Sequence, residues 1–219
     1  MESRKAQQVT VFFTSDTHFQ HALVSAHRGF ASPAEHDEEL IARWNETVGP
    51  DDTVWHLGDV TMGDRPAGLK LAARLNGTKH LIAGNHDHCW PGDRRSFRYQ
   101  RAYLEAFESV QAFAQVKVGG YWRLLSHFPY DGDHVGEERA TQFRLRDEGA
   151  MLLHGHIHDK TRRNGRQIHV GLDAWDLRPV PEDDIAALMT SGLRDSASPL
   201  HAREKGGRLR AGPPLITRR

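Results

Sequence analysis

Residues 80–87 read His-Leu-Ile-Ala-Gly-Asn-His-Asp, an apolar run that ends abruptly in polar side chains. The apolar part, His80–Ala83, has the length and composition of a short buried β-strand. Gly84 then lets the backbone turn sharply, where a larger residue would be strained. An amide, an imidazole and a carboxylate come directly after it, in Asn85, His86 and Asp87. The segment therefore predicts a strand that delivers metal-competent side chains to a loop.

The same arrangement, a strand-like run followed by polar side chains, recurs on both sides of this segment. Four further clusters have this character: Asp16-Thr17-His18, Gly58-Asp59, His127, and Gly155-His156-Ile157-His158. Strands of an open sheet end at a common edge, where the loops that follow them can converge. We therefore expect the five clusters to surround one site.

Strand-like and helical patterns alternate along the body of the chain. Strands are predicted at 9–14, 53–57, 80–83, 110–118, 121–125, 151–153 and 168–172. Helices are predicted to begin at Ser32, where Glu35 completes a capping box, at Asp64, and near Pro181. This alternation predicts an α/β or α+β layered fold rather than an all-β one. We expect one domain over residues 1–191.

The composition of the 219 residues excludes several classes of protein. A single cysteine, Cys89, rules out an internal disulfide framework and fits a reducing compartment. With 29 basic and 29 acidic side chains, the chain has no bulk positive field with which to bind polyanions. Neither a signal-peptide core nor a membrane-spanning run is found, so we expect a cytoplasmic protein without a membrane partner. The 15 histidines are the unusual feature, because imidazole is the commonest metal ligand.

Residues 192–219 differ from the rest of the chain. They carry seven basic side chains against two acidic ones, a net charge of +5, and few large apolar residues. Such a segment cannot bury enough apolar surface to offset the entropy of ordering, so we expect a disordered basic tail. The alternative is an electrostatic handle for RNA or another nucleic acid.

The spacing within the clusters favours a centre of two metal ions. Residues two apart in an extended segment point the same way, so Asp16 with His18, and His156 with His158, can each serve one centre. The two carboxylate oxygens of Asp59 can bridge two cations held about 3.5–4 Å apart. This mixed nitrogen and oxygen set suits Mn, Fe, Zn, Ni or Co rather than a thiolate site.

The five clusters, in this order, resemble the signature of the calcineurin-like metallophosphoesterase superfamily. That signature reads D-x-H, G-D, G-N-H-D/E, a lone H, and G-H-x-H, and here it spans Asp16 to His158. Trp44-Asn45 and the segment 170–180 resemble the subset of small bacterial and phage phosphoesterases. One position departs from the pattern: many relatives carry an acid three residues after the bridging aspartate, whereas this chain has Met62.

The resemblance implies a fold and a role for each matching residue. The fold would be a four-layer αββα sandwich of two mixed β-sheets flanked by helices. Two divalent ions are implied, with Mn²⁺ expected and Fe, Ni, Co or Zn as alternatives. One ion would be held by Asp16, His18 and His158, the other by Asn85, His127 and His156, with Asp59 bridging both. A hydroxide between the ions would attack phosphorus. His86 is the candidate general acid, and Asp87 would orient that imidazole or stabilise its charge.

The implied activity is hydrolysis of a small phosphoester, and several versions of it stay open. A phosphodiesterase acting on small nucleotide esters such as 2′,3′-cyclic nucleotides is the first expectation. The alternatives are a phosphomonoesterase, a dinucleoside polyphosphate hydrolase, and a non-catalytic scaffold of the same fold. Arg28 could clamp a substrate phosphate or be a solvated loop residue, and His21 and His27 could line the same mouth. The oligomeric state is not predicted.

Overall fold

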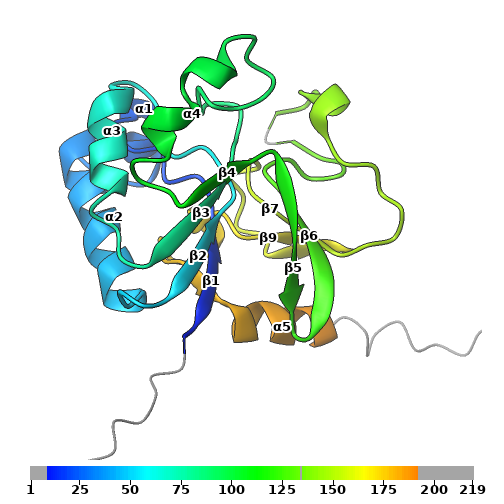
Figure 1. The fold of residues 1–219 in the computed structure, drawn as a ribbon. Helices are drawn as coiled ribbons and strands as arrows, with labels where there is room; N and C mark the ends of the chain where they lie inside the picture. The colour runs from blue at the N-terminus through cyan, green and yellow to red at the C-terminus, as the bar shows by residue number, and fades with distance from the viewer. Residues whose placement is uncertain (1–8, 134, 192–219) are drawn as a thin grey trace, which may run out of the picture.

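The computed structural model describes residues 9–133 and 135–191, which form two five-stranded β-sheets that face each other (Figure 1). The first sheet has the order β10-β1-β2-β3-β4. Its strands are β1 (Val11–Thr14), β2 (Thr53–His56), β3 (Thr78–Ile82), β4 (Ser109–Gln111) and β10 (Val180–Pro181). Strands β1 to β4 run parallel to one another, and β10 is antiparallel to β1. The parallel strands therefore all end at the same edge.

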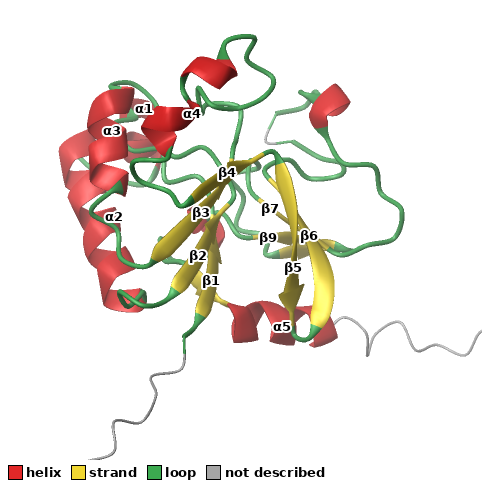
Figure 2. Cartoon of the chain, viewed as in Figure 1, coloured by secondary structure: helices red, strands yellow, loops and turns green. Residues whose placement is uncertain are grey.

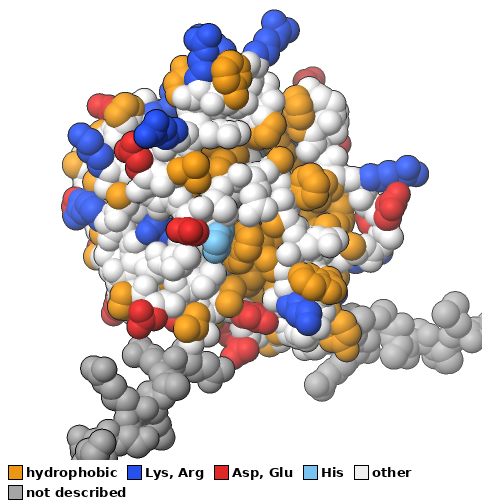
Figure 3. Space-filling view, in the orientation of Figure 1, with side chains coloured by type: hydrophobic (Ala, Val, Ile, Leu, Met, Phe, Trp, Pro, Cys, Tyr) orange, Lys and Arg blue, Asp and Glu red, His pale blue; other side chains and the backbone are white. Residues whose placement is uncertain are grey.

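The second sheet has the order β5-β6-β7-β9-β8. Its strands are β5 (Phe113–Val118), β6 (Tyr121–Ser126), β7 (Leu152–His154), β8 (Arg163–Asn164) and β9 (Gln167–His169). Strands β5 and β6 form an antiparallel hairpin, whereas β6, β7 and β9 are parallel. Exposed hydrophobic side chains gather over the β5–β6 hairpin, in the centre and right of the face seen in Figure 3; they include Phe113, Tyr121 and Trp122.

Four helices flank the first sheet, on the side away from the second (Figure 2). They are α1 (Ala22–His27), α2 (Pro33–Thr47), α3 (Arg65–Ala72) and α4 (Gln100–Tyr103), with a 3-10 turn at Ser96–Arg98. Two more 3-10 turns lie at Thr141–Phe143 and Leu172–Ala174, and α5 spans Glu182–Ser191. The predicted caps are confirmed: the side chain of Ser32 accepts a hydrogen bond from the Glu35 amide, and that of Asp64 accepts one from the Ala67 amide. The Glu35 carboxylate accepts from the Ala31 amide (2.9 Å) instead of the Ser32 amide, so the predicted capping box is only partly formed.

Two hydrophobic cores hold these layers together. The first fills the space between the first sheet and its helices and includes Phe12, Trp44 and Tyr103. The second lies between the two sheets, where Phe13, Leu57, Ile82, Leu125, Leu153 and Ile168 meet. Helix α5 adds Ile185 and Met189 to this second core and contacts both β1 and β5, so it closes one end of the sandwich. Both sheets are mixed, helices flank the first and α5 closes one end, which confirms the predicted α/β class with two mixed sheets.

One predicted strand is wrong, because residues 110–118 do not form a single element. The chain breaks at Ala112: β4 pairs with β3 in the first sheet, whereas β5 pairs with β6 in the second. Both halves carry β-favouring side chains, so local pattern alone does not reveal the crossing between sheets. Within the described ranges, no helix combines the length and apolarity that crossing a bilayer requires. The predicted tail at 192–219 lies outside the described residues.

The contact between α3 and the loop after β2 provides a test of this fold. A Cβ atom built on Gly68 would overlap the Oγ1 atom of Thr61 and lie 2.6 Å from its Cβ, and Thr61 is fully buried. Alanine is the better helix former, yet we expect Gly68→Ala to lower the free energy of unfolding by about 1–3 kcal/mol because of this overlap. Urea denaturation measures the change. Gly136→Ala, where a Cβ would meet nothing within 4 Å, is the control. A Gly68→Ala protein as stable as the wild type would contradict the packing described.

Candidate metal centre

The five predicted clusters meet at the edge where the parallel strands end. They occupy the loops that follow β1, β2 and β3 in the first sheet, and β6 and β7 in the second. Backbone hydrogen bonds join these loops: the Asp16 amide donates to the Gly58 carbonyl (2.9 Å), and the Gly155 amide donates to the His127 carbonyl (3.0 Å). The His156 amide donates to the Asp16 carboxylate (3.0 Å), which joins a loop of the second sheet to one of the first, so loops from both sheets surround a single site.

Glycine permits the closest approaches between these loops. A Cβ atom on Gly84 would lie 2.6 Å from the Asp59 amide nitrogen and 2.8 Å from the Cε1 atom of His127. A Cβ atom on Gly155 would lie 2.6 Å from the Asp16 Oδ2 atom. Real Cβ atoms essentially never come so close, so any larger residue at either position would displace a predicted ligand. Both positions therefore require glycine, because no side chain would fit between the loops.

The backbone of the predicted ligands is itself unusual. Nine non-glycine residues in the described part of the chain have a left-handed φ angle, and five of them are predicted ligands: Asp16, His18, Asp59, His156 and His158. This conformation costs on the order of 1–3 kcal/mol per residue and persists only where the surrounding structure imposes it. Such residues concentrate at functional sites, and here they coincide with the proposed metal centre.

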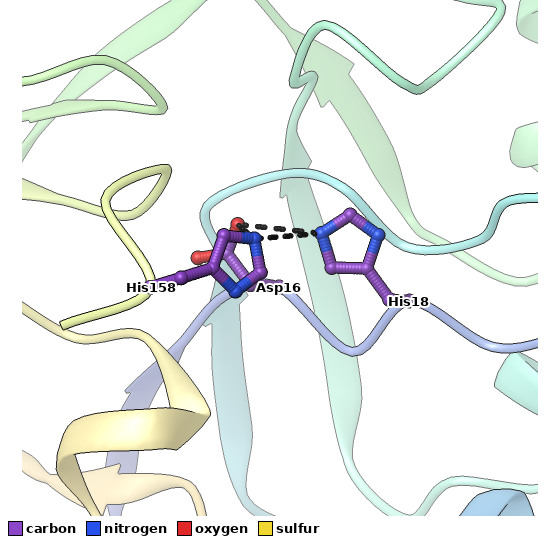
Figure 4. Close-up of side chains that lie close together, drawn as sticks. All are labelled: Asp16, His18 and His158. Atoms are coloured by element: carbon purple, nitrogen blue, oxygen red, sulfur yellow. Dashed lines mark hydrogen bonds and ion pairs between the residues drawn. The ribbon is translucent and has the colours of Figure 1, made fainter. Parts of the chain in front are cut away.

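The first ligand group consists of Asp16, His18 and His158 (Figure 4). The Nε2 atoms of the two histidines lie 3.1 Å apart. The Oδ1 atom of Asp16 lies 3.9 Å from the Nε2 of His18 and 3.8 Å from that of His158. Asp59 borders the group, because its Oδ2 atom is 3.7 Å from the Nε2 of His18. Donor atoms from three separate loops thus face one point.

The second ligand group consists of Asp59, His127 and His156, with Asn85 beside them. The Nε2 atom of His127 is 3.4 Å from the Asp59 Oδ2, 3.1 Å from the Asn85 Oδ1, and 3.3 Å from the Nδ1 of His156. The same Asp59 oxygen therefore faces both groups. All seven residues predicted as ligands come together here, and Asp59 occupies the position that the sequence predicts for a bridging carboxylate.

Hydrogen bonds on the far side of three imidazoles determine which nitrogen faces the centre. The Nδ1 of His127 donates to the Leu57 carbonyl (2.7 Å), and the Nδ1 of His158 donates to Asp173 (2.9 Å). The Nε2 of His156 donates to Asp133 (3.1 Å). In a neutral imidazole the other nitrogen then carries a lone pair, and in each case that nitrogen points at the ligand group. These side chains therefore fit a divalent cation as ligands.

The electrostatics of the group follow from burial and mutual proximity. Burial alone would raise the pKa of Asp16, but the His158 and His127 imidazoles lower it to about 2. Burial alone would lower the pKa of His127, whereas the Asp59 carboxylate raises it to about 9. The pKa of Asp59 lies well below its usual range, because His127 outweighs the effect of burial. Both carboxylates are thus held as anions, the form that binds a cation.

His86, the candidate general acid, lies at the rim of the centre. Its side chain is 33% exposed, and its Nε2 atom is 3.9 Å from the Asp59 Oδ2. Its ring centroid lies 5.4 Å from that of His18. One side of this imidazole faces the predicted ligands, and the other side faces solvent. This position suits proton donation to a leaving group.

The carboxylate of Asp87, which was predicted to orient His86, is instead directed toward backbone amides. Its carboxylate accepts hydrogen bonds from the backbone amides of Asp59 (2.9 Å), Val60 (3.0 Å) and Gly84 (2.9 Å). Burial and the nearby Asp59 carboxylate raise the pKa of Asp87 to about 7, although the amide donors oppose this rise. The hydrogen bonds of Asp87 tie the loop after β2 to the loop after β3. Its position is therefore that of a loop clamp.

Arg28, predicted as a phosphate clamp or a solvated residue, is instead almost completely enclosed. Its side chain is 4% exposed, and its Nε and Nη2 atoms donate to the two oxygens of Asp173 (2.8 and 2.9 Å). The Nη2 atom also donates to the backbone carbonyl of Asp16 (2.8 Å). In this conformation the guanidinium holds Asp173 and the Asp16 backbone, and Arg28 also borders the cavity beside the first ligand group.

The sequence did not predict the two aspartates that lie behind the ligand histidines. Asp173 accepts from His158 and pairs with Arg28, while Asp133 accepts from His156 and pairs with Arg139 (3.0 Å). Asp173 lies in the Val170–Val180 segment that already marks the resemblance, so a signal for it was present. Asp133 lies in a loop without periodic pattern, and its role depends on how that loop folds back.

Comparisons with known proteins agree with this geometry. A family profile described as the calcineurin-like phosphoesterase superfamily domain matches residues 9–171. The Gene 66 protein of Mycobacterium phage D29 is 49% identical over 185 residues, which cover 78% of this chain and 92% of the phage protein. The Gene 66 protein of Mycobacterium phage L5 is 42% identical over 193 residues, with 81% and 93% covered.

A solved structure is similar in fold. A protein of unknown function from Aquifex aeolicus superposes with a TM-score of 0.63 at 24% identity, covering 83% of this chain and all of the other. At that identity the likeness supports the fold alone. The extent of the family match, together with the two phage relatives, establishes the resemblance expected from the five clusters. This chain belongs to the calcineurin-like phosphoesterase superfamily.

Proposed function

We propose that this protein is a metal-dependent phosphodiesterase that uses two divalent cations to hydrolyse small nucleotide esters such as 2′,3′-cyclic nucleotides. The observation that carries the proposal is the position of Asp59, whose Oδ2 atom lies within 3.7 Å of His18 in one ligand group and 3.4 Å of His127 in the other. Two further observations support metal-dependent phosphoester hydrolysis. The chain belongs to a family of phosphoesterases, and its possible metal ligands form two groups of nitrogen and oxygen donors.

The proposed reaction adds water to phosphorus and breaks one ester bond. When bound, the cations would supply a nucleophilic water at neutral pH and neutralise charge on the phosphoryl oxygens. Asp16, His18, His158 and Asp59 would hold one cation, and Asp59, Asn85, His127 and His156 the other. His86 would give its proton to the leaving oxygen as the P–O bond breaks. A cyclic ester would open to a monoester with one free hydroxyl group.

The metal expected is Mn²⁺, with Fe, Ni, Co and Zn as alternatives. Four imidazole nitrogens, two carboxylates and one amide oxygen make up the ligand set, and no thiolate belongs to it. Such a set discriminates weakly among these ions, so metal availability would decide which is bound.

The first prediction concerns the bridging carboxylate. Asp59→Asn keeps the size of the side chain but removes the charge that both cations would share. We expect turnover of 2′,3′-cyclic AMP to fall by at least about a thousandfold, because the nucleophilic water depends on both ions. Elemental analysis after dialysis should find fewer than two Mn²⁺ ions per chain. Asp51→Asn, on an exposed turn, is the matched control. An Asp59→Asn enzyme with full activity and two bound ions would refute the bridging role.

The second prediction concerns His86. If this imidazole protonates the leaving oxygen, its loss should matter most when the leaving group is a poor one. We expect His86→Ala to slow opening of 2′,3′-cyclic AMP by about 10²–10⁴-fold, and hydrolysis of bis-p-nitrophenyl phosphate by less than about tenfold. Steady-state kinetics on both substrates measure the two factors. Equal losses would show that His86 does not act as the acid.

The third prediction concerns the carboxylate behind His158. Asp173→Asn places an amide where His158 now donates, which would disturb the orientation of that imidazole and its choice of tautomer. We expect the affinity for the more weakly held Mn²⁺ to fall about 10–100-fold. Calorimetric titration measures the affinity, with circular dichroism to show that the variant is folded. The control is Asp147→Asn, which breaks an exposed pair with Arg166. Unchanged Mn²⁺ binding in Asp173→Asn would contradict the supporting role.

A further inference from the structure

A cavity of about 790 Å³ opens beside the first ligand group. The imidazoles of His18, His86 and His158 form part of its wall. Apolar side chains line it as well: Leu23 and Val24 from α1, Met62 from the loop after β2, and Leu177 from the segment after the last 3-10 turn. The cavity therefore adjoins the proposed reacting centre and also offers an apolar surface. Its volume is within the range that holds a nucleotide-sized ligand.

Charge distinguishes this cavity from its neighbour on the other side of the centre. The neighbouring cavity, of about 680 Å³, is lined by Asp131, Asp133 and Asp159. The first cavity has Arg28, Arg43 and Lys160 on its wall against Asp173 and Asp176, and Lys160 also borders the neighbouring cavity. The negative charge of a phosphoester lies on its phosphate, so approach to the centre meets less repulsion through the first cavity than through the more acidic one.

Packing within the described part of the chain does not explain why Leu23 is a leucine. Its side chain is 59% exposed, and it is absent from both hydrophobic cores of the described chain. The buried residue of α1 is Ser25, which packs on the opposite side of the helix turn. Covering an exposed leucine with an apolar group is favourable by roughly 25 cal/mol per Å² of area removed from water. Leu23 and Val24 thus offer a ligand an apolar surface at the mouth of the centre.

We infer that Leu23, Val24 and Leu177, here named the aliphatic shelf, bind the base of a nucleoside phosphoester whose phosphate is held at the metal centre. This inference rests on the proposed function and specifies its substrate class. Flat heterocycles stack on apolar side chains as well as on aromatic ones. The imidazoles of His21 and His27 also line the cavity and offer hydrogen-bonding groups to a bound nucleoside, with the His21 ring centroid 5.2 Å from that of His18.

The test separates the base from the phosphate. The Mn²⁺-loaded wild type and Leu23→Ser are compared on 2′,3′-cyclic AMP and on 1-O-methylribose 2′,3′-cyclic phosphate, which has no base. Serine removes apolar surface without adding a charge that would repel either ester. We expect the ratio of kcat/KM for the nucleotide to that for the abasic ester to fall about tenfold in Leu23→Ser. Leu104→Ser, at another exposed leucine (50%) outside the cavity, should leave the ratio unchanged.

A binding measurement accompanies the kinetics. Calorimetry should show 3′-AMP binding to Leu23→Ser about tenfold more weakly than to the wild type, with ribose 3-phosphate affected much less. Equal losses with and without a base, or no preference of the wild type for the base, would overturn the assignment of the shelf. A wild type that hydrolyses neither ester would refute the proposed function instead, and the calorimetric comparison would then decide the shelf by itself.

Discussion

Four imidazoles and two carboxylates lie within a few ångströms of one another, and the surrounding structure holds them in this crowded arrangement. The Nε2 atoms of His18 and His158 lie 3.1 Å apart, with Asp16 and Asp59 beside them. Groups of this kind repel or desolvate one another unless a shared partner joins them, and a divalent cation is the partner that suits such donors. The strained backbone angles at five of the ligands have the same origin: the side chains meet only if the loops turn unusually tightly.

The strain persists because a second set of contacts holds each loop. Asp87 accepts three backbone amides and ties two loops together, and small glycines let the backbones approach. Behind the ligands, Asp173 and Asp133 fix imidazole orientation, and arginines in turn hold these carboxylates. Arg28 comes from the segment between α1 and α2, so the long first loop contributes to the rigidity of the centre as well as to the wall of the cavity. Pre-organised ligands of this kind lose little entropy when a cation binds.

Reaction class and substrate choice reside in different parts of the molecule. The ligands come from loops at the strand ends, where both sheets contribute. The surroundings that would select a substrate come mainly from α1, α2 and the segment after the last 3-10 turn. A superfamily can therefore keep its centre while its loops vary, which is why membership in the family leaves the substrate to be argued from the cavity.

Most of the strand-and-loop pattern, the five clusters with their seven candidate ligands, and the helix caps could be predicted from the sequence alone, because each of these is a local feature with its own periodicity or motif. Three features depend on the tertiary structure: residues 110–118 divide between two sheets, Asp87 accepts hydrogen bonds from backbone amides, and Arg28 pairs with Asp173. Arg28 and Asp173 are 145 positions apart. Contacts over such a separation depend on the path of the whole chain, and no local pattern of hydrophobicity or charge records that path.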